Sequence, residues 1–570
     1  MKRHWLWLVA LLLALLCYPP QWYPQPIKRL QTSLFGAPAD RALPASRPHE
    51  MSGDMHGNMH AATEPPEVFC PEDPENWRAT HEIEGVKIEA AETCVADNPW
   101  LVAASVKGTN KVSAETLMRS GLTADAVELG RDLDGDGDPD EIHIRLEVAE
   151  LNGASPIADT PVTRYAIAPG VEPGLWVFVP KLTGMAVENF ESQQARPELR
   201  LPSPAIRIEQ GDVVQITLEN GHYMPHTIHL HGADHPFVDV NGEGNDGVPL
   251  VSEIPVLPGA ARTYELSPRH SGTMFYHCHV HAHVHMQMGL QGLFIIEENR
   301  PDNWLQTLNL GAGQVRVRSV ASREQYTGEY DLHYMDLDRQ LVERIQKSND
   351  PRVITRSMHN DYAVNDATQD YFTINGRSFP YAFRESLVIG SEGDRIKLRV
   401  VNGGEKGLAL HTHGHKFTAT HRDGVEIPEM ARSPQDVAWL ANAQRLDLDL
   451  DMTNDGLHAD GPGIWMFHDH EAKGMTTDGI GPGGNKSAIV YREYLDENGW
   501  PKTQGMSFDA LFTAAYYRKE IPVWSSYLPG LLDDAGDDRW LLWRLLGLAL
   551  ALGLLLALVL KTFVRWLMAP

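Results

Sequence analysis

The feature that most constrains this chain is an internal repeat. Two blocks, at about residues 160–300 and 370–500, each carry one His-x-His motif early and another near the last apolar run. Both blocks consist of short apolar runs separated by glycine, proline and asparagine turns, a pattern typical of β-sandwiches. The sequence therefore predicts two similar, mainly β domains that each bring histidines to a matched place.

The paired histidines predict a metal centre. On a β-strand, residues i and i+2 point to the same face, so each His-x-His motif presents two imidazoles in one direction. Neutral imidazole is a ligand for copper, zinc and iron. Four such pairs at matched positions in a repeat are hard to obtain by chance. The eight histidines are His229, His231, His277, His279, His411, His413, His468 and His470.

Cys278 stands inside the second histidine pair of the first block. The chain has four cysteines. Cys17 lies in an apolar leader, and Cys70 and Cys94 are close enough in sequence to form a disulfide in an oxidising compartment. A thiolate with two imidazoles, and often a weak axial methionine, is the ligand set of a blue copper site. Cys278 is thus a candidate copper ligand.

With these residues the two blocks resemble the multicopper oxidases, over a little under half of the chain. The resemblance implies two cupredoxin-like Greek-key β-sandwich domains and four coppers per chain: one type 1, one type 2 and two type 3. By position, it implies that His229 and His411 hold the type 2 copper. It implies that the type 3 pair is held by His231, His277, His279, His413, His468 and His470.

The blue, type 1 copper is expected in the first block alone. Cys278 supplies the thiolate there, and His226, three residues before His229, supplies the first imidazole. The equivalent places in the second block hold Leu408 and Asp469. Because neither side chain can replace a thiolate, the second block should bind no blue copper.

The third type 1 ligand has two candidates. Counting forward from Cys278, the spacing Cys-x4-His-x4-Met selects His283 with Met288. Counting back from the strand that begins at Leu290, the spacing of the family selects His285, with Leu290 or Met288 as the axial neighbour. Strand register is harder to change than loop length, and this favours His285.

The arrangement predicts a laccase-like, copper-dependent oxidoreductase. Electrons from a phenolic compound or a metal ion such as Cu(I) would pass through Cys278 to His277 and His279, where O2 is reduced to water. The resemblance to two-domain members with the blue copper in domain one implies a homotrimer. Two alternatives remain open: a copper-containing nitrite reductase, whose type 2 copper needs only three histidines, and a non-catalytic periplasmic copper-binding or resistance protein.

The chain ends predict membrane attachment and export. Residues 1–23 are expected to be a signal or N-terminal anchor, and residues 540–560 a transmembrane helix. Acidic residues precede the second segment and Lys561 and Arg565 follow it, which places the catalytic domains outside the cytoplasm, in the periplasm or at the cell surface. The formal net charge of -27 argues against a nucleic-acid partner.

The remaining segments divide the chain further. Residues 24–69 are predicted to be a linker, whose thioethers and imidazoles between Met51 and His60 either collect copper or occur by chance. An N-terminal extension over 70–155 precedes domain one at 156–300. A connection at 301–369 leads to domain two at 370–500, and a linker at 501–539 follows.

An acidic loop in the N-terminal extension is a candidate calcium site. Carboxylates alternate around glycine there, and oxygen ligands of this kind suit a hard cation, although position twelve of an EF-hand would be His143. An acidic turn without metal is the competing interpretation. The candidate calcium ligands are Asp132, Asp134, Asp136, Asp138 and Asp140.

Overall fold

The computed structural model divides the chain into two compact units, Thr63–Glu520 and Met1–Ala62 with Ile521–Pro570. The residues that it describes are 81–83, 86–88, 125–155, 161–181, 199–300, 307–309, 313–316, 326–496, 500–504, 513–520 and 541–567. The predicted leader, the linker over 24–69 and the pair Cys70 and Cys94 lie outside the described residues.

Two five-stranded sheets form the first β-sandwich. They pack face to face, with the ring of Phe178 centred 5.8 Å from that of Tyr276. One sheet contains β3 (Val127–Leu129), β4 (Glu141–Leu151), β5 (Leu175–Pro180), β7 (Val213–Glu219) and β9 (Ala261–Leu266). The other contains β6 (Ala205–Glu209), β8 (His229–His231), β10 (Gly272–His277), β11 (Gln291–Glu297) and β12 (Leu308–Asn309).

The first sandwich begins before the predicted boundary at residue 156. β4 pairs in parallel with β7, so that Glu141 lies opposite Val213. The alternating residues Ile142, Ile144 and Leu146 are buried, as a strand with one face on the core requires. The period-two pattern of β4 directly follows the acidic loop. The predicted N-terminal extension over 70–155 therefore contains a strand of the first sandwich.

The second β-sandwich pairs an eight-stranded sheet with a five-stranded one, and apolar residues of both sheets form one core. The larger sheet contains β13 (Gly313–Arg316), β14 (Gly328–Leu337), β15 (Tyr371–Ile374), β17 (Arg395–Asn402), β19 (Phe417–Arg422), β20 (Val425–Glu426), β21 (Pro434–Gln435) and β23 (Arg445–Asp451). The smaller contains β16 (Val388–Gly390), β18 (Leu408–Thr412), β22 (Val437–Leu440), β24 (Ile464–Asp469) and β25 (Lys486–Tyr491).

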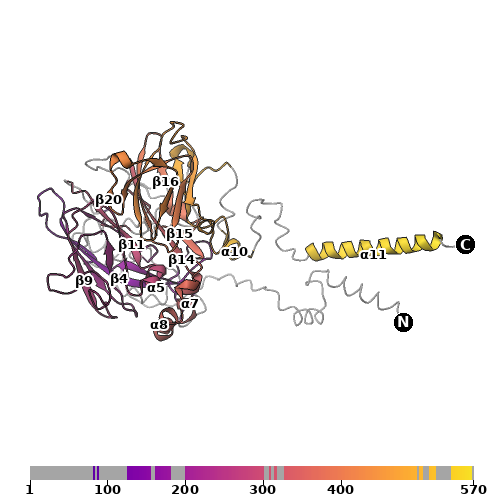
Figure 1. The fold of residues 1–570 in the computed structure, drawn as a ribbon, viewed down its shortest axis with the longest axis horizontal. Helices are drawn as coiled ribbons and strands as arrows, with labels where there is room; N and C mark the ends of the chain where they lie inside the picture. Colours follow the sequence, from indigo (N-terminus) through magenta and orange to yellow (C-terminus); the bar gives the residue numbers. More distant parts are fainter. Residues whose placement is uncertain are drawn as a thin grey trace, which may run out of the picture. The chain divides into compact units, whose positions relative to one another are not determined.

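Figure 1 labels β4, β9 and β11 of the first sandwich and β15, β16 and β20 of the second. The prediction of a mainly β chain with two β-sandwiches is confirmed. The second sandwich also begins earlier than the predicted residue 370, because β13 and β14 of the connection pair with its larger sheet.

Several helices and one two-stranded sheet complete the described chain. The sheet pairs β1 (His81–Ile83) with β2 (Val86–Ile88). The helices are α5 (Ala282–Met288), α6 (Arg339–Val342), α7 (Arg344–Lys347), α8 (Pro351–His359), α9 (Ala382–Ser386), α10 (Ala514–Tyr517) and α11 (Leu541–Leu567), with 3-10 turns η3 (Val364–Asp366), η4 (Glu429–Ala431), η5 (Lys473–Met475) and η6 (Arg492–Tyr494).

The predicted membrane-spanning helix overlaps α11. Within the described side chains, which in α11 are those of residues 547 and 549–564, no helical stretch is both long and apolar enough to cross a membrane. Membrane anchoring by residues 540–560 remains a prediction.

The two sandwiches pack against each other through apolar and charged residues. Phe275 of β10 and Ile295 of β11 share a small apolar core with Val401 of β17. Beside it, the guanidinium of Arg207 donates two hydrogen bonds to Asp331, at 2.7 and 2.9 Å. All five side chains are buried, so the interface fixes one orientation of the sandwiches within their compact unit.

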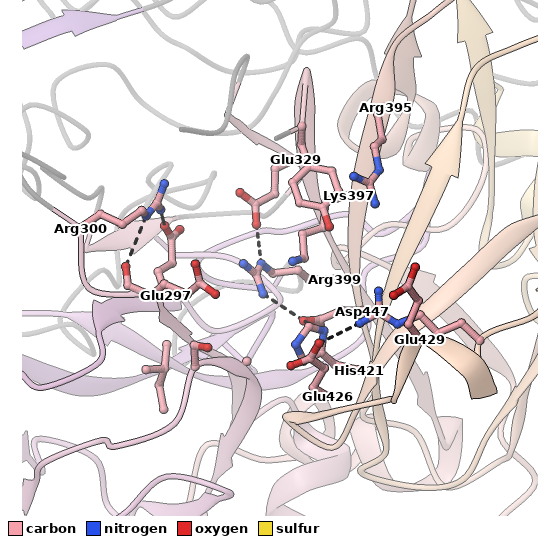
Figure 2. A pocket seen from close by; sticks show the side chains of 16 residues that line it. Glu297, Arg300, Glu329, Arg395, Lys397, Arg399, His421, Glu426, Glu429 and Asp447 are labelled. Carbon is pink, nitrogen blue, oxygen red and sulfur yellow. Dashed lines mark hydrogen bonds and ion pairs between the residues drawn. The ribbon is translucent and has the colours of Figure 1, made fainter. Parts of the chain in front are cut away.

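A cavity of about 410 Å³ lies next to this interface and is lined mainly by charged side chains. Figure 2 shows the guanidinium of Arg399 between the carboxylates of Glu329 and Asp447, with which it forms ion pairs. These charges are buried and paired, which is how a protein interior tolerates them. The cavity thus belongs to the packing of the two sandwiches.

Candidate metal centre

Cys278 lies between two imidazoles directly after β10. Its Sγ is 3.6 Å from Nδ1 of His226 and 3.3 Å from Nδ1 of His285. All three side chains are fully buried, and their three donor atoms lie within 4.8 Å of one another. Burial raises the pKa of the thiol to about 12, and binding of a metal cation would remove its proton. One thiolate and two imidazoles form a donor set that suits copper.

Helix α5 decides between the two candidate histidines. Residues three apart share a helix face, and His285 and Met288 both lie on the buried face of α5. His283 is exposed, and its ring lies 6.0 Å from that of His281. The structure therefore brings His285 to Cys278 and leaves His283 outside the group.

A second layer of polar residues supports His226. Its Nε2 lies 2.9 Å from Nδ1 of His222, whose Nε2 lies 3.8 Å from Glu150. The indole of Trp176 donates to Glu150 at 2.9 Å, and its ring is centred 5.2 Å from that of His285. Sequence reasoning missed these three supporting residues. The sequence does contain a signal for His222, because His222 and His226 form a His-x3-His pattern.

The first histidine set lies on two neighbouring antiparallel strands. His229 and His231 begin and end β8, and His277, the last residue of β10, pairs with His229. Nε2 of His231 lies 3.0 Å from Nε2 of His277. The ring of His279 is centred 5.1 Å from that of His229. The strand pairing thus gathers four imidazoles on one side of Cys278.

The second histidine set repeats this geometry. His411 of β18 pairs with His468 of β24, and Nε2 of His413 lies 3.1 Å from Nε2 of His468. The ring of His470 is centred 5.4 Å from that of His411. Both sandwiches therefore build a similar four-imidazole arrangement, the first on β8 and β10 and the second on β18 and β24.

Backbone carbonyls orient the rings in both sets. A carbonyl only accepts, so a ring Nδ1 within hydrogen-bond distance of one carries the proton and leaves the lone pair on Nε2 for a metal. Burial lowers the pKa of His277 to about 3 and that of His231 to about 4, which keeps both neutral near pH 7. The oriented pairs are His229 with Asp246 (2.6 Å), His277 with Cys278 (3.0 Å), His411 with Asp436 (2.9 Å) and His468 with Asp469 (2.8 Å).

The two histidine sets remain separate within one chain. Among the described residues, no group of donor atoms within 4.8 Å combines members of both sets. The ring contacts of the eight histidines likewise join members of one set only, in the part of the chain that is described. One chain thus presents two half-sites of four imidazoles each.

The acidic loop contains two groups of carboxylates. Asp132, Asp134 and Asp136 form an outer, mostly exposed group. A second group joins Asp136 and Asp138 to Glu209, the last residue of β6, which sequence reasoning missed. Burial, together with neighbouring carboxylates, raises the pKa of Asp136 to about 6. The five predicted aspartates therefore do not surround one common ion position.

Comparisons with known proteins agree with the geometry of the first sandwich. Residues 194–301 match the sequence profile of the family described as multicopper oxidase. Iron transport multicopper oxidase FET3 of Saccharomyces cerevisiae is 31% identical over 140 residues, which are 23% of this chain and 21% of the yeast protein. Copper resistance protein A of Pseudomonas syringae pv. tomato is 23% identical over 248 residues, 40% of this chain and 39% of that protein.

These matches cover only part of each relative: the chain spans between 21% and 39% of the length of these two proteins. Among solved structures, the blue copper oxidase from Nitrosomonas europaea is 24% identical, with a TM-score of 0.44, over 62% of this chain and 86% of that one. The profile match contains the first histidine set, Cys278 and His285. The predicted resemblance to the multicopper oxidases is confirmed over residues 194–301, which match that family.

Proposed function

We propose that this protein is a copper-dependent oxidase that couples one-electron oxidation of a reductant to the four-electron reduction of O2 to water. One observation carries the proposal. Cys278 is buried between His226 and His285, and its two sequence neighbours, His277 and His279, belong to the adjacent four-imidazole half-site.

The proposed oxidase would hold four coppers per chain. His226, Cys278 and His285 would hold a type 1 copper, with buried Met288 as the axial candidate. His229 and His411 would hold the type 2 copper. The type 3 pair would be held by His231, His277, His279, His413, His468 and His470. Copper at these positions would supply one-electron transfer at the thiolate and four-electron reduction of oxygen at the three-copper centre.

The chain itself provides the connection between the two kinds of site. Successive residues of an extended chain point to opposite faces, so Cys278 faces one side while His277 and His279 face the other. The two sites are thus joined by a few covalent bonds. Burial of Cys278 and His285 keeps water from the thiolate.

The separate half-sites support a homotrimer as part of this proposal. A three-copper centre of eight imidazoles needs both sets, and among the described residues no donor group within 4.8 Å combines them. In a closed ring, the first half-site of each chain would face the second half-site of the next.

The reductant and the location belong to the same proposal. The names of the two relatives refer to iron transport and copper resistance, and these favour a metal ion such as Cu(I) as reductant, with a phenolic compound as the other choice. The apolar stretch 540–560 would anchor the chain, with the catalytic domains outside the cytoplasm.

Metal counting with oxygen uptake tests the proposal. Copper-loaded protein without residues 51–60 should contain four coppers per chain, show the blue thiolate absorption and consume O2 with Cu(I) or a phenol. Two coppers per chain, or turnover of nitrite without oxygen uptake, would contradict it.

A further inference from the structure

The buried carboxylate group joins two segments that lie far apart in the sequence. Asp136 and Asp138 belong to the loop before β4, whereas Glu209 ends β6. Their ligand oxygens lie within 4.8 Å of one another, and Asp138 and Glu209 are 4% and 3% exposed. The backbone of the two segments also meets, because Val213 N donates to Asp140 O at 2.8 Å. A ligand held here would contact both segments.

Asp212 adds a fourth carboxylate that has an unsatisfied oxygen. The side chain is 1% exposed. Its Oδ2 accepts a hydrogen bond from Glu209 N at 2.7 Å, but its Oδ1 is buried and, among the described residues, has no hydrogen-bond partner. The charges that act on it come from Asp136, Asp138 and Asp140. Oδ2 of Asp136 is likewise buried without such a partner within the described chain.

Buried carboxylate oxygens without a partner are costly. Water could donate hydrogen bonds to them, but it would leave several negative charges close together in a poorly solvated place. A cation satisfies the oxygens and neutralises the charge at once. Carboxylate oxygens select a hard cation over copper or zinc, and an irregular set contributed by two segments suits the flexible coordination of calcium better than the strict octahedron of magnesium.

The rest of the acidic loop already has another role. Asp132 accepts from the backbone N–H groups of Gly135, at 2.5 Å, and Gly137, at 3.1 Å. Asp140 accepts from the N–H groups of Leu133 and Asp134. These carboxylates fold the loop, and the fold carries Asp136 and Asp138 toward Glu209.

We propose that Asp136, Asp138 and Glu209 bind one calcium ion beside the buried carboxylate of Asp212. The ion ties the loop before β4 to the turn between β6 and β7. The ion stabilises the first sandwich. It lies at the end of β11 opposite to α5, because Glu209 pairs with Glu297 whereas α5 precedes Gln291. The calcium site therefore acts on stability and does not depend on the proposed oxidase activity.

Calcium titration of the full-length, copper-loaded protein in detergent tests this proposal. We expect one calcium ion per chain by calorimetry and a thermal midpoint several degrees higher in CaCl2 than in calcium-free buffer, with a smaller rise in MgCl2. No calcium-dependent rise would overturn the proposal, and an equal response to magnesium would overturn the choice of calcium.

Matched variants identify the ligands. Asp212→Asn and Glu209→Gln should weaken calcium binding by about tenfold or more, because each removes a negative charge at the ion. In calcium-free buffer the same variants should melt at or above the wild-type temperature, since they remove repulsion between carboxylates. This reversal distinguishes a lost ion from a damaged fold.

Asp134→Asn is the control, because Asp134 belongs to the exposed group and keeps a hydrogen-bonding oxygen. It should bind calcium more tightly than Asp212→Asn does. Wild-type affinity in both buried-site variants, or a larger loss in Asp134→Asn, would overturn the assignment.

Discussion

The two half-sites share a frame but differ at the residue between the last two histidines. In the first sandwich that residue is Cys278, whose thiol faces His226 and His285. In the second it is Asp469, whose Oδ1 accepts from the N–H groups of Ala409 at 3.2 Å and Glu471 at 3.0 Å. At this strand position, the first sandwich offers a sulfur to a metal, whereas the second offers a carboxylate that accepts hydrogen bonds from backbone N–H groups.

The difference shows that the imidazole frame and the thiolate site are separable. The residue between two histidines points to the opposite face, so exchanging it leaves the histidines in place. Two further changes accompany it: Leu408 stands where the first sandwich has His226, and the 3-10 turn η5 (Lys473–Met475) stands where α5 carries His285. The second sandwich thus keeps four imidazoles and, among its described residues, lacks the thiolate of the blue copper set.

The largest effect is expected from Cys278→Ser. Loss of the thiolate should abolish the blue absorption, remove one copper per chain and lower oxygen uptake by orders of magnitude. Copper analysis and oxygen electrode measurements check this. Asp469→Asn, at the matched position, should keep the full copper content and the blue absorption. Equal copper loss in both variants would show that Asp469 is needed for copper binding as much as Cys278 is.

The next effect concerns the pairing of half-sites. His231→Ala and His413→Ala should each inactivate the protein when expressed alone. If the centre forms between chains, co-expression should restore about one quarter of the activity, because about one quarter of randomly assembled interfaces then join two intact half-sites. Activity that stays at background, in assemblies shown to contain both variants, would place the eight imidazoles within one chain.

The sequence predicted the imidazole frame because the strand period of two is local. His-x-His fixes the facing of both rings whatever surrounds them. It could not decide between His283 and His285, because that choice depends on where α5 begins. Nor could it find Glu209 beside Asp136, since pairing of β4 with β7 brings together segments more than 60 residues apart.

A smaller effect is expected when the carboxylate of Asp469 is removed. Asp469→Ala leaves two backbone N–H groups next to the second half-site without their acceptor, so the free energy of unfolding should fall by about 1–3 kcal/mol. Asp469→Asn retains an acceptor oxygen and should lose less. Denaturant titration of both variants, without copper, checks the order. Equal losses in Asp469→Ala and Asp469→Asn would mean that the amide oxygen of the Asn variant does not replace the carboxylate as hydrogen-bond acceptor.

The smallest effect is expected from a double variant that makes the second sandwich more like the first. Leu408→His with Asp469→Cys gives the second sandwich the histidine and cysteine positions of the first, yet η5 carries no histidine to take the place of His285. A thiolate and one imidazole fall short of the blue copper set, so the blue absorption should stay at the single-site level of the parent protein. Absorption spectra and copper counts on the double variant check this. A second blue copper would show that the strand positions alone define the site, and that α5 is not what confines it to the first sandwich.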